Sequence, residues 1–144
     1  MNKTETLNNG VRLLRIPDKS TKLIMIQINM RIGSDIENTT LLESCHLFEH
    51  LFAAYTSTKY PFSKKNTEIL DFKSINNNAE VIEKEITFSL YFNKLNIEYV
   101  IDLLTNALID FKIDKTIFEQ EKNAVIEELN EIIKDADYNF NTKI

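Results

Sequence analysis

Both histidines of the chain lie in one short stretch, "SCHLFEHLF", with a glutamate between them. On a helix, His46 and His50 project from one face about one turn apart, so their imidazoles can bind the same metal ion. Glu49 then lies beside the ion, where a general base for a water molecule belongs. The pattern H-x-x-E-H therefore predicts a metal centre with hydrolytic chemistry. The alternative is a pair of helix histidines without a ligand role.

Two glutamates further along the chain supply an independent observation. On a helix predicted over residues 115–134, Glu121 and Glu128 fall on the apolar arc, two turns apart. The apolar residues of this arc are Phe118, Val125, Leu129 and Ile132. An ionised carboxylate in an apolar layer costs several kcal/mol unless it is paired or bound to a cation. A divalent ion held by His46, His50 and Glu128 would keep one position open for water, as catalytic sites do. The alternative is an arc too shallow to be buried, with both carboxylates at its wet edge.

Hydrophobic periodicity predicts the elements that must position these residues. Strands are expected at 11–16, 22–32, 76–81 and 86–92, the last two joined by a turn near Glu83 and Lys84. Helices are expected at 39–55, 96–109 and 115–134, the first capped by Thr39 or Thr40. The polar segment after the first helix is expected to be irregular, with a short helical turn around "EILDF", and the tail 135–144 is expected to be loose. The fold class is therefore α+β, with an antiparallel-rich sheet packed against helices.

Composition limits the other possibilities. The 144 residues suit one domain, 1–144, and the net charge of −5 with scattered lysines argues against a nucleic-acid partner. No apolar run has membrane-spanning length, and the first residues lack the apolar segment of a secretory signal. Cys45 is the only cysteine, which excludes an internal disulfide. These features predict a soluble, cytoplasmic protein.

Five segments of the chain resemble the pitrilysin/insulinase family of zinc metallopeptidases, which includes the mitochondrial processing peptidases. They are "LNNGVRLLRIPD", "INMRIGSDIENTT", "SCHLFEHLF", "NNNAEV" and "EKNAVIEEL". The resemblance implies a fold similar to half of a mitochondrial processing peptidase unit and one Zn²⁺ per chain. It also implies roles for single residues: His46, His50 and Glu128 as ligands, Glu49 as general base, and Glu121 as the second active-site glutamate. Glu121 would orient a histidine ligand or help to stabilise the transition state.

The resemblance also places Asn78 and Ala79 where the strand of the family touches the substrate backbone. The chain departs from the family pattern nearby. "AAYTSTKYP" lacks the usual glycine-threonine segment, "KSINNN" replaces a glycine pair, and Val81 stands in place of a threonine. These departures concern loop geometry and substrate contacts, and they do not touch the metal ligands.

The implied function is that of a hydrolase: a zinc-dependent endopeptidase in which water activated by the metal attacks the scissile carbonyl. Peptides or small precursor proteins are the expected substrates, including ribosomally made precursor peptides. The repeating unit of the family is longer than this chain, so a second copy or a separate subunit is expected to complete the substrate chamber. One alternative is a non-catalytic, peptide-binding subunit of a heteromeric peptidase. The other is a metal-dependent lyase of the S-ribosylhomocysteine type, which would need a cysteine ligand downstream of Cys45 that the chain lacks.

Overall fold

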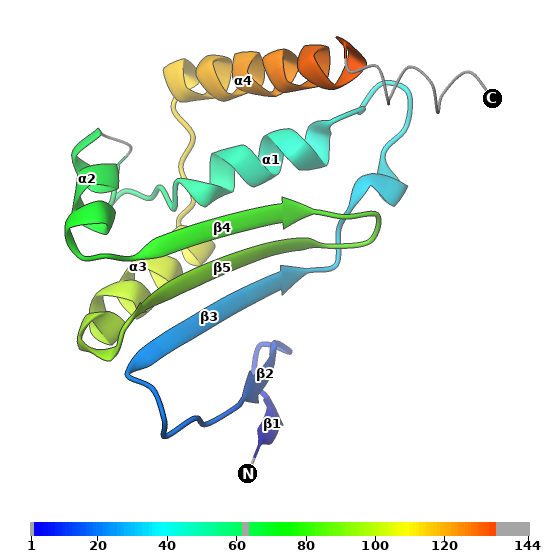
Figure 1. Ribbon diagram of the computed structural model, residues 1–144. Helices are drawn as coiled ribbons and strands as arrows, with labels where there is room; N and C mark the ends of the chain where they lie inside the picture. Colours follow the sequence, from blue (N-terminus) through cyan, green and yellow to red (C-terminus); the bar gives the residue numbers. More distant parts are fainter. Residues whose placement is uncertain (1, 62–63, 135–144) are drawn as a thin grey trace.

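A three-stranded antiparallel sheet organises the computed structural model, which describes residues 2–61 and 64–134 (Figure 1). The strands β3 (Leu23–Met30), β4 (Asn76–Val81) and β5 (Ile86–Asn93) are arranged in the order β3-β5-β4. Alternation of apolar and polar residues predicted the inner face of β5 correctly, because its alternate residues are at most 1% exposed. These residues are Ile86, Phe88, Leu90 and Phe92. The turn predicted between β4 and β5 is also confirmed.

Two helices cover the inner face of the sheet. The core joins the inner face of β5 to α1 (Ser44–Ala53) and α3 (Ile97–Ile109). A third helix, α4 (Lys115–Lys134), packs against α1 on the side away from β4 (Figure 1). The helix α1 therefore lies between the edge strand β4 and α4, and side chains from both neighbours can reach it.

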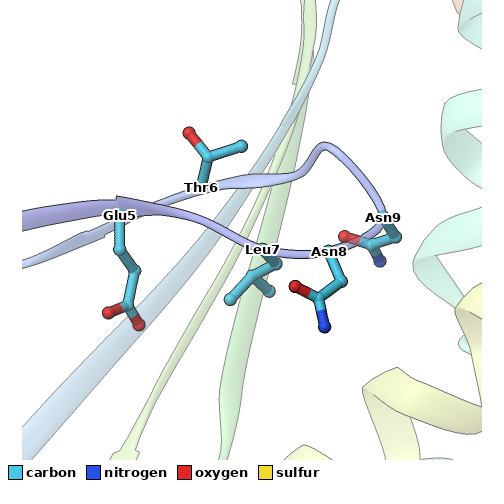
Figure 2. Close-up of a pocket in the computed structure, with 5 residues that line it drawn as sticks. All are labelled: Glu5, Thr6, Leu7, Asn8 and Asn9. Atoms are coloured by element: carbon cyan, nitrogen blue, oxygen red, sulfur yellow. The ribbon is translucent and has the colours of Figure 1, made fainter.

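A separate hairpin precedes the sheet. It joins β1 (Lys3–Thr6) to β2 (Arg12–Arg15), and only the second of these strands was predicted. The turn places Gly10 at φ +86°, a conformation that glycine adopts without strain. A hollow of about 550 Å³ lies beside this turn and is lined by residues 5–9, which Figure 2 shows as sticks. Its one acidic residue, Glu5, is paired with Arg15 and Lys3, and none of the predicted site residues lines it.

The helix that carries the histidines begins later than predicted. It starts at Ser44 instead of Thr39 or Thr40, because the hydroxyl and amide of Thr40 both bond the side chain of Asn38. A second difference lies at α2 (Lys64–Phe72), a helix where only a short turn was expected. Leu70 packs from this helix against the core, a tertiary contact that polar local composition does not reveal.

The buried faces of the last two helices also differ from the predicted ones. In α3 the helical period predicts an apolar stripe of Ile97, Val100, Ile101, Leu104 and Leu108. Burial of Val100 and Leu104 is confirmed, whereas the other three are exposed and Leu103 and Ala107 are buried instead. In α4 the predicted bounds are correct, but Phe118 and Ile132 are exposed. The predicted loose tail, 135–144, lies outside the described residues. Among the described helices, none is long and apolar enough to cross a membrane.

Candidate metal centre

The approach to α1 is fixed by a close backbone contact. Gly33 lies so near the turn between β4 and β5 that a Cβ atom would stand 2.4 Å from the carbonyl oxygen of Ile82. The amide of Asp35 donates to the carbonyl of Glu83 at 2.9 Å, and the thiol of Cys45 donates to the carbonyl of Gly33 at 3.2 Å. The start of α1 is therefore tied to the sheet through the residues around Gly33.

The first turn of α1 is capped by a carboxylate from outside the helix. Glu37 accepts the amide of Glu43 at 2.8 Å and the amide of Cys45 at 2.6 Å, two of the donors that a helix start leaves unpaired. Burial raises the pKa of Glu37, but hydrogen bonds from Cys45 and Glu43 outweigh it, so the net pKa lies below its ordinary value. The sequence analysis missed this cap, because Glu37 lies several residues before the helix.

The two imidazoles are each placed between carboxylates. Nδ1 of His46 lies 3.0 Å from Glu43, and Nδ1 of His50 lies 3.2 Å from Glu121. The Nε2 atoms of the two rings lie 3.3 and 3.7 Å from one oxygen of Glu128. The structure therefore brings together four of the predicted residues, from α1 and α4, and adds Glu43.

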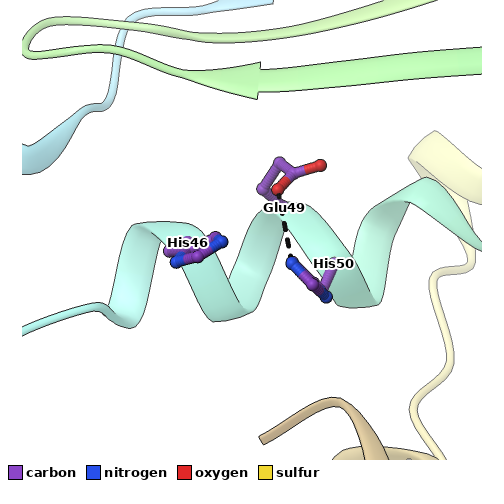
Figure 3. Close-up of side chains that lie close together, drawn as sticks. All are labelled: His46, Glu49 and His50. Atoms are coloured by element: carbon purple, nitrogen blue, oxygen red, sulfur yellow. Dashed lines mark ion pairs between the residues drawn. The ribbon is translucent and has the colours of Figure 1, made fainter. Parts of the chain in front are cut away.

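Glu49 lies on α1 as well, with its carboxylate beside His50. Its side chain is 14% exposed, and its carboxylate is 3.9 Å from Nε2 of His50 (Figure 3). Burial raises its pKa above the usual range, and the neighbouring His50 and His46 oppose this rise only in part. A carboxylate with a raised pKa is suited to accepting and returning a proton near neutral pH.

The donor atoms fit a small divalent cation. His46, Glu49 and His50 could hold a metal ion, because their ligand atoms lie within 4.8 Å of one another. Two donors about 2.0–2.1 Å from one tetrahedral ion lie roughly 3.3–3.4 Å apart. The spacing from Glu128 to the two imidazoles, 3.3 and 3.7 Å, is close to this value, whereas the shortest contact from Glu49 to His50 is 3.9 Å. Two imidazoles and a carboxylate are also a donor set that zinc accepts in catalytic sites.

The two α4 glutamates are less buried than the apolar arc of this helix predicts. We expected both carboxylates inside a buried apolar arc, but Glu128 is 49% exposed and Glu121 is 28% exposed. The alternative of a wet edge therefore describes Glu128 better. The predicted direction of the two side chains is nevertheless right. Val125, which lies between them in the sequence, is buried, so their side of α4 faces α1.

Asn78 and Ala79 lie on β4, next to α1. In the antiparallel register Ala79 pairs with buried Phe88, and Asn78 pairs with Ser89 on the other face of the sheet. The side chain of Asn78 therefore points away from α1. Within the described sheet β4 is an edge strand, so contact with a peptide near α1 would use its backbone rather than this side chain.

Comparison with known protein families identifies the family of this chain. The chain matches the model of the insulinase family, peptidase family M16, over residues 12–141. The chain belongs to this family. An M16 fold with antiparallel strands and helices agrees with the α+β class that the sequence predicts, and the match includes every residue of the candidate centre.

Individual M16 relatives extend well beyond this chain. "Uncharacterized zinc protease YmxG" of Bacillus subtilis (strain 168) is 29% identical over 132 residues, which are 90% of this chain and 31% of that protein. The periplasmic protease PqqL from Escherichia coli shares the fold with a TM-score of 0.85 at 18% identity, over 98% of this chain and 16% of that one. Pitrilysin superposes with a TM-score of 0.79 at 25% identity, over 90% and 14%. The chain thus spans a third or less of these relatives.

Proposed function

We propose that this chain carries the zinc centre of an M16 endopeptidase. The observation that supports the proposal most strongly is the convergence of Glu128 on both imidazoles, because it joins residues 78 and 82 positions apart in a catalytic type of donor set. In this proposal His46, His50 and Glu128 bind one Zn²⁺ per chain. The fourth position stays open for water or for a substrate carbonyl.

The residues around the ligands have distinct proposed roles. A bound zinc ion would supply Lewis-acid activation of water and of the scissile carbonyl. Glu49 accepts the proton that the attacking water loses and returns it to the leaving amine. Glu121 accepts the Nδ1 hydrogen of His50, which fixes the ring with Nε2 towards Glu128. These roles need no residue beyond those that α1 and α4 already place together.

The edge strand beside this centre favours an extended peptide as the substrate. Among the described residues no further strand pairs with the outer edge of β4, so a peptide could bind there as an added strand, with Asn78 and Ala79 supplying backbone contacts. Sequence-independent backbone contacts suit a peptidase that processes peptides or small precursor proteins, among them ribosomally made ones. A second copy or another subunit would complete the chamber. The lone cysteine favours a reducing compartment, and we place the protein in the cytoplasm.

The test compares Glu49→Gln with a matched control, Glu98→Gln, which changes an exposed glutamate on α3. We expect Glu49→Gln to bind one zinc per chain and to lose cleavage of a fluorogenic peptide mixture by about 10²–10⁴-fold, because the general base is gone. The control should match the wild type in both measurements. Absence of zinc from the purified wild type would contradict the ligand assignment. Zinc binding and peptide crosslinking without cleavage would instead favour a peptide-binding subunit.

A further inference from the structure

Each imidazole of the centre has its own carboxylate on the Nδ1 side. For His50 this partner is Glu121, from another helix; for His46 it is Glu43, 3.0 Å away and three residues earlier in the chain. An ionised carboxylate can only accept, so each of these bonds forms in the tautomer that carries the hydrogen on Nδ1. In a neutral imidazole the lone pair is then on Nε2, the nitrogen that faces Glu128.

The backbone of Glu43 is unusual. It has φ 64° and ψ 13°, the left-handed conformation that favours glycine and that few other residues adopt. Asparagine and aspartate are the common exceptions, because their short side chains bond the local backbone. The Glu43 carboxylate bonds the ring of His46 instead. Strained backbone conformations cluster at functional sites, where the surrounding structure maintains them.

Capping of α1 does not require the side chain of Glu43. Glu37 supplies the side-chain cap by accepting the amides of Glu43 and Cys45, and Glu43 takes part through its backbone, whose carbonyl accepts the amide of Leu47 at 2.9 Å. Each of these bonds would survive replacement of the Glu43 side chain. The carboxylate is therefore left with His46 as its partner, and the left-handed turn directs it back to that ring.

We propose that Glu43 is a positioning residue for the metal centre: its carboxylate holds the hydrogen of His46 on Nδ1 and orients the ring so that Nε2 faces Glu128. This inference rests on the proposed zinc centre. Glu43 would do for His46 what Glu121 does for His50, so a carboxylate would orient each of the two rings. The N-cap position just before α1 supplies one of these carboxylates, while α4 supplies the other.

Two substitutions separate this role from a purely structural one. Glu43→Gly removes the carboxylate and also relieves the left-handed strain, so the metal-free protein should unfold a few degrees higher than the wild type. The same variant should bind zinc about 10–100-fold more weakly in a chelator competition, as loss of a partner of a histidine ligand usually causes. Glu43→Gln keeps an acceptor oxygen and should retain most of the affinity.

Nitrogen-15 NMR of the imidazoles supplies a readout that does not depend on zinc. With two histidines in the chain, each ring can be assigned in the metal-free protein at mildly alkaline pH. In the wild type the hydrogen of His46 should be on Nδ1. In Glu43→Gly it should shift towards Nε2, where Glu128 can accept it, while the signals of His50 stay unchanged.

The outcomes are distinguishable. Weaker zinc binding together with a shifted His46 hydrogen and a higher unfolding temperature supports the proposal. Wild-type zinc affinity and an unchanged His46 signal in Glu43→Gly overturn the role of Glu43 and leave the zinc centre intact. Failure of the wild type itself to bind zinc overturns the proposed function and this inference with it.

Discussion

Glu127 and Glu128 are neighbours on α4, and their carboxylates point in directions about 100° apart around the helix. Only Glu128 lies within 3.7 Å of both imidazoles, whereas Glu127 is exposed on the adjoining side. This pair offers a matched comparison, because the two substitutions change the net charge and the helix equally. The difference between them reports on position alone.

We therefore expect Glu128→Gln to weaken zinc binding strongly and Glu127→Gln to leave it unchanged. Loss of an anionic ligand removes both a donor and the charge that offsets the cation, so the fall in affinity should exceed the roughly 10–100-fold typical of an outer partner. Isothermal titration of the metal-free variants with zinc measures this directly. Equal affinities of the two variants would show that Glu128 is not a ligand.

Tyr55, just after α1, is strained and buried at once. It is 1% exposed, has φ 49°, and its hydroxyl has no hydrogen-bond partner among the described residues. Burial raises the pKa of this hydroxyl well above its usual range. An unpaired buried polar group costs about 1–3 kcal/mol. Relief of a left-handed conformation is worth only about 1–2 kcal/mol per residue.

These magnitudes predict opposite effects for two substitutions of Tyr55. Tyr55→Phe removes the unpaired hydroxyl, keeps the ring and should stabilise the fold by about 1 kcal/mol or leave it unchanged. Tyr55→Gly relieves the strain but loses the buried ring, so it should destabilise by several kcal/mol. Urea unfolding followed by circular dichroism gives both values. A marked loss of stability in Tyr55→Phe would mean that the hydroxyl is bonded in solution.

At the scale of elements, local periodicity predicted the three strands of the main sheet and the bounds of α4 well, missed β1 and placed the start of α1 too early. The alternation in β5 follows directly from burial of one face. Because side chains alternate between two faces, the pattern of apolar residues shows which face is buried. The start of α1 depends on Glu37, which reaches the helix across a loop, and on the contact of Gly33 with a distant turn. Neither interaction leaves a signal in a local sequence window.

Most residues of the candidate centre could be predicted, because their relative positions follow from helical geometry. His46, Glu49 and His50 lie within one helical turn, so their geometry follows from their spacing. The α4 glutamates were found by the phase of the helix, although the burial that we inferred for Glu128 was too high. Glu43 was missed, because the sequence does not indicate that a glutamate before the helix adopts a left-handed backbone conformation.

The cap on α1 predicts a dependence of stability on pH. The pKa of Glu37 is lower in the folded protein than its ordinary value of 4.5, so its contribution is present above that value and is lost as the pH falls through the folded pKa. Glu37→Gln should cost about 1 kcal/mol at neutral pH, as loss of a helix cap does. The difference from the wild type should shrink in acid. Urea midpoints across this pH range measure it.

A suitable control for the cap is Asp35→Asn, an exposed acidic residue two positions earlier. It removes the same charge near the start of α1 without touching the two amides that Glu37 accepts. Its stability difference should be small and nearly constant with pH. A pH-independent difference for Glu37→Gln would show that its carboxylate does not act as the cap.

At the scale of the whole molecule, several large apolar side chains lie on the surface. On the sheet face opposite the helices, Met25 and Tyr91 form an exposed cross-strand pair, with Leu23 beside them. Contiguous apolar surface on a soluble domain usually marks a contact with another chain or domain. The chain also spans only 14–31% of the relatives described above. The exposed apolar face suits the second copy or other subunit proposed above.

We therefore expect the isolated chain to associate with itself, with a mass in light scattering above the 16.8 kDa of one copy. If the sheet face takes part, Met25→Lys should shift the mass towards the monomer, because it places a charge in the apolar contact. Zinc affinity should stay unchanged, since the proposed ligands lie on α1 and α4, on the other side of the sheet. Thr105→Lys adds the same charge at an exposed position of α3, away from this face, and serves as the control. A monomeric wild type that cleaves peptides at full rate would contradict the need for a partner, because one copy would then hold and cut its substrate unaided.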